Sequence, residues 1–160
     1  WKNKLKQFNK PIIAINWQGN KNFLFDYERS IDLIKFKNIL KIKKYNFISL
    51  QKNFGSEQIN KYNLDNLIHD FSHIIDIKEN AFEDTIHILN NIDLLITTDT
   101  ALAHLAGTMG VKTNLLLSYN PEWRWLIELN YKCFYPNLKI FQQKKANDWE
   151  KVFLELQKTL

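Results

Sequence analysis

The stretch from residue 93 to residue 110 constrains the fold more than any other part of this sequence. It opens with the short apolar run Leu-Leu-Ile at positions 94–96, which is typical of a fully buried strand. Four short polar residues follow at positions 97–100, and their side chains suit the start of a helix. Apolar residues then recur at helical spacing as far as Gly110, a residue that ends helices readily. The stretch therefore predicts a strand, a tight turn and a helix.

The rest of the chain continues this alternation of short apolar runs and helical patterns. Buried-type strands are predicted at positions 12–17, 45–51, 113–118 and 138–141, with a weaker candidate at 67–71. The Ser30 hydroxyl is the expected N-terminal cap of the first full helix, and helices are predicted at positions 31–40, 56–62, 81–91, 120–129 and 148–160. Strands that alternate with helices form βαβ units around a parallel sheet. We therefore expect an α/β fold, a Rossmann-like open parallel sheet with helices on both faces.

The composition is that of an ordinary globular protein and argues against several functional classes. The chain has 160 residues, enough to bury the core of one domain. Its net charge is +5, but the lysines are scattered rather than gathered in a basic stripe, so we expect no nucleic-acid partner. No apolar run approaches the ~20 residues of a membrane span. Cys133 is the single cysteine, which excludes an internal disulfide and fits a cytoplasmic location, and no cluster of His and Cys suggests a metal.

Polar residues gather where the predicted strands end. Gln18, Gly19 and Asn20 follow the first strand, and Gln51 and Lys52 end the second. Because the carboxyl ends of parallel strands meet at one edge of a sheet, we expect these residues to border a single cleft. The helix that begins near position 100 starts at the same edge, and its free N–H groups suit an anion.

Several segments, taken together and in order, resemble the donor-binding half of a bacterial glycosyltransferase. The family is that of tetratricopeptide-repeat proteins whose carboxyl-terminal region is similar to heptosyltransferases and, more remotely, to protein O-linked N-acetylglucosamine transferases. The resemblance spans nearly the whole chain. The matching segments lie at positions 15–20, 29–31, 49–52, 82–85, 99–107, 121–126, 134–136 and 148–149.

The resemblance implies a two-domain GT-B enzyme of which this chain is the carboxyl-terminal half. Residues 1–10 are then the tail of an interdomain helix, and residues 11–160 the domain that binds a nucleoside-diphosphate sugar as substrate. Such domains need no cofactor and no obligatory metal. The upstream half would bind the acceptor, a protein or a glycan, and supply the base that activates its hydroxyl.

The resemblance also assigns the donor diphosphate to the start of the helix near position 100. Asp99 and Thr100 match the acidic and hydroxyl pair of the family, and the free N–H groups of Thr100, Ala101 and Leu102 would bond phosphate oxygens. A plainer interpretation is that Asp99 only caps the helix, which needs no ligand. Both interpretations can hold together.

Four further residues have a functional and a structural interpretation. Arg29 stands where the family has a basic residue, and a guanidinium there would clamp two phosphate oxygens; otherwise it is a solvated loop charge. His104 lies one helical turn after Thr100, where the family also has a His; it is a donor contact or a hydrogen-bonded structural residue. Lys21 is a weaker candidate for the wall of the cleft. Glu57 resembles an acidic residue that binds ribose hydroxyls in relatives.

Two other functions compete with donor binding. A degenerate transferase-like domain would serve as a protein-interaction module and would bind no nucleotide. A basic nucleic-acid binder would show affinity for RNA or DNA that depends steeply on salt, but the sequence lacks a strand with clustered aromatic and basic residues.

Overall fold

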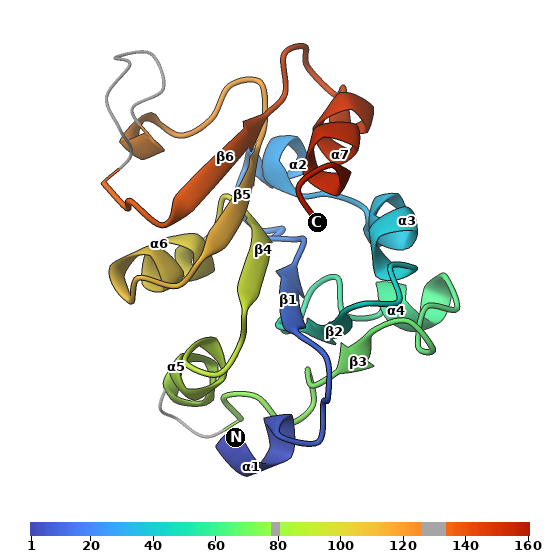
Figure 1. Cartoon of the computed structure of the whole chain (residues 1–160). Coiled ribbons are helices and arrows are strands. Elements are labelled where there is room, and N and C mark those ends of the chain that lie inside the picture. The colour runs from blue at the N-terminus through green and yellow to red at the C-terminus, as the bar shows by residue number, and fades with distance from the viewer. Residues whose placement is uncertain (78–80, 126–133) are drawn as a thin grey trace.

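One six-stranded parallel sheet forms the centre of the molecule (Figure 1). The computed structural model describes residues 1–77, 81–125 and 134–160. The strand order is β3-β2-β1-β4-β5-β6, and every neighbouring pair is parallel. This is the order of the dinucleotide-binding Rossmann fold, so the fold class expected from the sequence is confirmed. The strands are β1 (Ile12–Asn16), β2 (Asn46–Ser49), β3 (His69–Asp70), β4 (Leu94–Thr98), β5 (Thr113–Leu117) and β6 (Leu138–Gln142).

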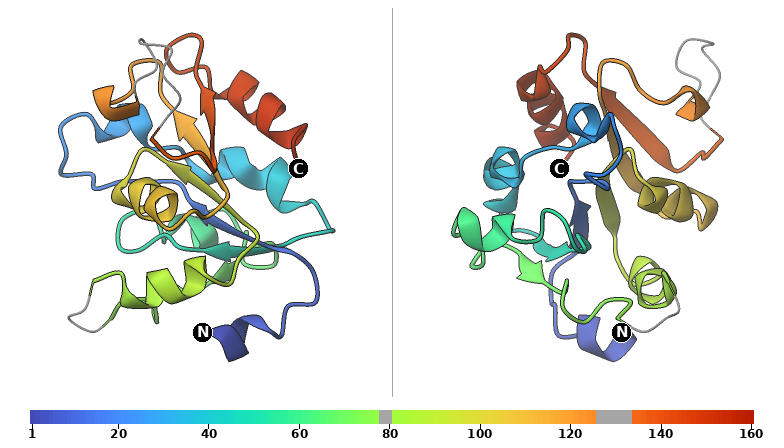
Figure 2. Two further views of the ribbon diagram at one scale, coloured as in Figure 1. Left: turned by 60° about the vertical axis from the view of Figure 1, so that its left-hand side comes forward. Right: turned by 180° about the vertical axis from the view of Figure 1, so that it is seen from behind.

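Helices cover both faces of the sheet (Figures 1 and 2). They are α1 (Lys2–Leu5), α2 (Asp26–Arg29), α3 (Lys37–Leu40), α4 (Gln58–Lys61), α5 (Glu83–Leu89), α6 (Ala101–Thr108) and α7 (Trp149–Gln157), with the 3-10 turns η1 (Leu33–Phe36) and η2 (Trp123–Trp125). In the described part of the chain no helix has both the length and the apolar character that crossing a bilayer requires.

The alternation of side chains along β1 divides the core into two layers. Ile13 and Ile15 pack with residues of η1, α3, α4 and α7 on one face, whereas Ile12 and Ala14 pack with α1, α5 and α6 on the other. Successive residues of a strand point to opposite faces, so a strand covered on both sides must be apolar throughout. This is why the buried strands read as continuous apolar runs in the sequence.

The segment after β1 differs from the sequence prediction. Ser30 does not cap a helix over positions 31–40; it follows α2 in an extended conformation, and the next turn, η1, is capped by the Asp32 carboxylate. The Ser30 hydroxyl instead accepts the Gly19 N–H at 3.0 Å and donates to the Asp26 carboxylate at 2.8 Å. Asp26 is buried, and its carboxylate needs hydrogen-bond donors. The Ser30 hydroxyl therefore bonds to Asp26 and does not cap the helix that the sequence predicted.

The helix predicted at positions 120–129 is described only in part. Its first turn is the 3-10 turn η2, and positions 126–129 lie outside the described residues. Trp125 of this turn is buried in a small cluster with Ala103 of α6 and with Leu115 and Leu117 of β5.

Candidate functional site

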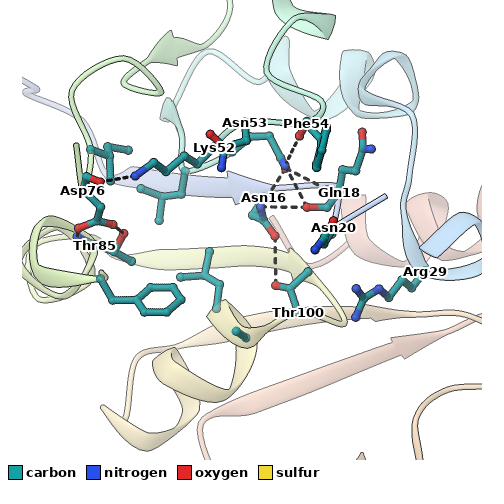
Figure 3. Close-up of a pocket in the computed structure, with 17 residues that line it drawn as sticks. Asn16, Gln18, Asn20, Arg29, Lys52, Asn53, Phe54, Asp76, Thr85 and Thr100 are labelled. Atoms are coloured by element: carbon teal, nitrogen blue, oxygen red, sulfur yellow. Dashed lines mark hydrogen bonds between the residues drawn. The ribbon is translucent and has the colours of Figure 1, made fainter. Parts of the chain in front are cut away.

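A cleft of about 520 Å³ opens at the carboxyl ends of β1, β2 and β4 (Figure 3). The chain runs from β1 outward to β3 and then returns to the other side of β1 at β4, and ligands of open α/β sheets bind at such a reversal. The structure gathers here most of the residues that the sequence singled out, namely Gln18, Gly19, Asn20, Arg29, Gln51, Lys52, Thr100, Ala101 and Leu102. Lys21, Glu57, Asp99 and His104 do not line this cleft.

The start of α6 presents free backbone donors to the cleft. Thr100 is the N-cap residue, with an extended backbone (φ −139°, ψ 169°), and no side chain caps the helix. Among the described residues, nothing accepts a hydrogen bond from the N–H groups of Thr100, Ala101 and Leu102. The first bonded group is the Ala103 N–H, which donates to the Thr100 carbonyl at 3.0 Å. Unpaired N–H groups at the positive end of a helix form an anion site.

Asn16 fixes the turn that carries these donors. Its amide oxygen accepts the hydroxyl of Thr100 at 3.2 Å (Figure 3) and the hydroxyl of Thr97, also at 3.2 Å. These bonds tie the end of β1 to β4 and the turn after it. The Thr100 hydroxyl is therefore engaged within the protein. Anion binding at this turn is left to the backbone.

Arg29 lies at one end of the cleft and is held from three sides (Figure 3). Its Nε donates to the Asp26 carboxylate at 3.0 Å and its Nη1 to the Asp99 carbonyl at 2.9 Å, while the guanidinium carbon lies 4.7 Å from the centre of the Phe23 ring. Its Nη2 lies close to Gly19, because a Cβ atom added to Gly19 would lie 2.7 Å from this nitrogen. The missing side chain of Gly19 thus leaves room for a preorganised cation beside the free N–H groups.

Gln51 shapes the cleft with a side chain whose hydrogen-bonding capacity is fully used. Its Oε1 accepts the Asn16 side-chain amide and the N–H groups of Trp17 and Gln18, at 2.8–3.0 Å. Its Nε2 donates to the carbonyls of Gln18 and Phe54. The buried amide therefore holds the two loops at the rim in place and has no group left for a ligand.

The end of the cleft away from Arg29 carries the polar side chains of Lys52, Asp76 and Thr85 (Figure 3), and the cleft also has apolar lining residues. Leu50, Ile75 and Phe82 line it. Phe82 has a left-handed backbone (φ 67°) just before α5, and 41 % of the residue is exposed. A positive φ is costly for a bulky residue, and such strain concentrates at functional sites. The sequence carried no signal for this conformation.

A network at the start of α5 supports this end of the cleft. The Asp76 carboxylate accepts the hydroxyl of Thr85 (Figure 3) and the backbone N–H of Asp84, and so caps α5. The Lys52 ammonium donates to the Asp76 carbonyl. The amine predicted at the rim of the cleft is thus tied to the loop after β3.

His104 is packed against aromatic side chains outside the cleft. Its ring stacks on Trp125 at 4.4 Å between centroids, with 11° between the planes, and its Nδ1 lies 3.2 Å from the Tyr135 hydroxyl. Burial lowers the pKa of His104, and the charge of Arg124 lowers it further. These contacts agree with the structural interpretation of this residue.

The remaining candidates lie elsewhere. The Glu57 carboxylate accepts the Gly55 N–H at 2.8 Å, and the Lys21 ammonium lies 4.9 Å from the centre of the Phe54 ring. Asp99 lines a second cavity on the far side of Arg29. Within the described ranges, no three His, Cys, Asp or Glu residues are grouped so that they could hold a metal ion.

Comparison with known proteins relates this chain by fold to a glycosyltransferase structure. No family model matches the sequence, and no curated protein sequence matches it. The structure is similar to that of E. coli ADP-heptose LPS heptosyltransferase II, with a TM-score of 0.63 and 12 % identity over 98 % of this chain. The match covers 50 % of the heptosyltransferase chain, so this chain spans about half of its length. The likeness is one of fold.

Proposed function

We propose that this domain binds the nucleoside-diphosphate part of a sugar donor in the main cleft and forms the donor half of a glycosyltransferase. The observation that carries the proposal is the combination of an anion site with apolar lining residues in one cleft. Free N–H groups and Arg29 form an anion site at one end, and the lining of the cleft also includes the apolar side chains of Leu50, Ile75 and Phe82. A nucleoside diphosphate combines a charged diphosphate with a flat, largely apolar base.

The diphosphate would lie at the start of α6. The N–H groups of Thr100, Ala101 and Leu102 offer hydrogen bonds, and the Arg29 guanidinium adds a fixed positive charge. Hydrogen bonds of this kind to a charged group contribute about 1.5–3 kcal/mol each. Such donors would bind a diphosphate without a metal ion.

The base would lie against the apolar lining residues. Among the described residues that line the cleft, Phe82 and Phe54 are the aromatic ones, and Phe82 has a left-handed backbone. Stacking of a base on an aromatic ring contributes about 1–3 kcal/mol. The proposal assigns the nucleoside, rather than the sugar, to these side chains.

In the proposed reaction an acceptor hydroxyl displaces the nucleoside diphosphate from the sugar. Negative charge grows on the leaving diphosphate, and donors already fixed in place stabilise it most when the bond breaks. The base that removes the hydroxyl proton would come from outside these residues. The fold match to half of a heptosyltransferase supports this division of labour, and the sequence resemblance proposes a repeat-containing protein as the whole, with a protein or glycan acceptor.

Substitution of Ala101 by proline tests the anion site with the least disturbance of the fold. Ala101 is the first residue of α6, the helical position that tolerates proline, and the preceding Thr100 is extended as proline requires. The change removes one cleft-facing N–H group and fills its place with the proline ring. Calorimetric titration with ADP, GDP and UDP first identifies the nucleotide that binds the parent protein most tightly. We expect the dissociation constant for that nucleotide to rise about tenfold or more in Ala101→Pro.

Ala101→Ser is the matched control, because it keeps the N–H group at the same position. It should bind the nucleotide within about twofold of the parent protein, and both variants should melt within about 3 °C of it. A parent protein that binds none of the three nucleotides at millimolar concentration would favour the non-catalytic interaction module. Equal affinities for Ala101→Pro and the parent would show that nucleotide binds elsewhere.

A further inference from the structure

The segment before β1 shares a small core with one wall of the main cleft. α1 lies beside α5 (Figures 1 and 2). Leu5 of α1 is buried in the apolar layer that also contains Ile75 and Ile88, and the centre of the Trp1 ring lies 5.5 Å from that of Phe71. Ile75 lines the cleft, whereas Trp1 does not. Any effect of Trp1 on a ligand is therefore indirect.

Trp1 is hydrogen-bonded to a pair of aspartates that hold each other in place. The Asp84 Oδ2 accepts the backbone N–H of Asp76 at 2.9 Å, and the Asp76 Oδ1 accepts the backbone N–H of Asp84 at 2.8 Å. The Trp1 indole Nε1 donates to the other oxygen of Asp84, Oδ1, at 2.6 Å. Hydrogen bonds to carboxylates are short and strong. The indole thus ties α1 to the Asp76–Asp84 pair.

Asp76 carries this tie into the cleft. Its carbonyl accepts the Lys52 ammonium and its carboxylate accepts the Thr85 hydroxyl, and all three residues line the cleft (Figure 3). Three hydrogen bonds therefore lead from Trp1, which lies outside the cleft, to Lys52 on its rim.

The wall that these bonds hold has an unfavourable backbone. Asp76 and Phe82 both have a left-handed conformation, with φ 47° and φ 67°. A residue other than glycine pays a conformational cost there, and it keeps such a conformation only when the surrounding contacts fix it. The hydrogen bonds of the Asp76–Asp84 pair are contacts of this kind, and Trp1 holds the carboxylate of Asp84 in the orientation that they require.

We propose that Trp1 is a positioning residue, which through Asp84 and Asp76 fixes the wall of the cleft beside Ile75 and Phe82 and so strengthens binding of the nucleoside. The inference rests on the proposed function, which places the base against these apolar side chains. Loss of the indole bond would loosen this wall and leave the anion site at the start of α6 unchanged. The segment before β1 would then control the affinity for a ligand that it does not touch.

The test compares a nucleoside diphosphate with pyrophosphate, which carries the charged groups without the nucleoside. Trp1→Phe keeps an aromatic ring beside Phe71 and removes the indole N–H. By calorimetric titration it should weaken the best-binding of ADP, GDP and UDP about fivefold or more and leave the affinity for pyrophosphate within about twofold. A general loss of stability would weaken both ligands alike.

Hydrogen exchange tests the structural step directly. The backbone N–H groups of Asp76 and Asp84 are donors within the pair, and both should exchange about fivefold or more faster in Trp1→Phe. The Ala103 N–H, which donates to the Thr100 carbonyl at 3.0 Å in the first turn of α6, should exchange at the parent rate.

Two further variants are the controls. Lys4→Met removes an ammonium that lies 5.2 Å from the centre of the Trp1 ring and 5.7 Å from that of Phe71, but it leaves the indole bond in place. It should bind both ligands as the parent does. Asp84→Asn keeps an acceptor at only one of the two oxygen positions and should weaken the nucleotide as Trp1→Phe does. Because Trp1 acts through Asp84, the double variant should bind nucleotide within about twofold of Asp84→Asn alone.

Three results would overturn the inference while leaving nucleotide binding intact. They are a parent-like affinity for nucleotide in Trp1→Phe, equal losses for nucleotide and pyrophosphate, and a double variant in which the two losses multiply. A parent that binds none of the three nucleotides would remove the proposed function itself. The exchange rates of Asp76 and Asp84 would then still decide whether Trp1 fixes this wall.

Discussion

Replacement of Gln51 by methionine should destabilise this domain far more than the same replacement of Gln143. Both glutamines are buried, at 2 % and 4 % exposure, and methionine has nearly the shape of glutamine without its polar atoms. They differ in their partners. The Gln51 amide makes five hydrogen bonds, whereas the Gln143 oxygen accepts only the Tyr119 N–H and its Nε2 has no partner within the described structure.

The magnitude follows from the groups that each replacement leaves unpaired. Without Gln51, the N–H of the fully buried Trp17 loses its acceptor, and the buried Asn16 side-chain amide keeps only a long hydrogen bond of 3.5 Å to the Gln18 carbonyl. A buried group left unsatisfied costs about 1–3 kcal/mol, so the two together cost about 2–6 kcal/mol. The groups of Gln18 and Phe54 lie nearer the solvent and can bond to water. Such a loss is a large part of the about 5–15 kcal/mol that stabilises a typical domain.

Gln143→Met should change the free energy of unfolding by no more than about 1 kcal/mol. It frees the N–H of Tyr119, which is half exposed, but it also removes a buried donor that had no acceptor. Urea denaturation of both variants, followed by circular dichroism, measures the two free energies of unfolding. Similar values for Gln51→Met and Gln143→Met would refute the reasoning, because burial alone would then set the cost.

Two further perturbations test other parts of the site. Gly19→Ala should lower the affinity for nucleoside diphosphate and should lower the free energy of unfolding by about 1–2 kcal/mol, because the new Cβ would meet the Arg29–Asp26 pair. Calorimetric titration and urea denaturation measure the two effects. Parent-like values for both would show that the pair can shift freely. Burial, and then the charge of Arg124, lowers the pKa of His104 in the folded protein below its ordinary value of 6.5. The unfolded state therefore binds the proton more readily, and the free energy of unfolding should fall as the pH drops through about 6.5. The difference between free energies of unfolding at about pH 7.5 and about pH 5.5 should therefore shrink in His104→Gln, and an unchanged difference would assign the pH dependence to other groups.

The fold places chemistry at one edge of the sheet through the path of the chain. β1 contributes Asn16 and the loop with Gly19, β2 contributes Gln51, and the turn after β4 contributes the free N–H groups of α6. These segments are far apart in sequence and adjacent in space because β1 lies between β2 and β4. The reversal of strand order therefore creates the cleft and supplies its walls.

The sequence by itself determined the fold class and the rim of the cleft. Apolar runs of strand length alternating with helical patterns predicted the parallel sheet, and the strand–turn–helix unit appears as β4 and α6 close to its predicted positions. Residues after β1, at the end of β2 and in the turn before α6 do line one cleft. These predictions succeed because the period of apolar residues follows directly from which face of each element is buried.

Only the tertiary structure decided which of these residues are free to meet a ligand. Gln51 looks like a cleft residue in the sequence, but its amide is used up by partners from two other loops. Ser30 looks like a helix cap, but buried Asp26 takes its hydroxyl. The demands of buried polar groups are satisfied by partners that are distant along the chain, and no local pattern records them.

Asp99 and Thr100 show the same limit most clearly. The sequence places them side by side as one diphosphate-binding pair, whereas the structure places Thr100 on the main cleft and Asp99 on the second cavity. The backbone is extended at Thr100, and in an extended chain successive side chains point to opposite sides. The extended backbone of the turn into α6 thus separates the side chains of Asp99 and Thr100, although the residues are neighbours in sequence. The loops packed around that turn decide which cavity each side chain faces.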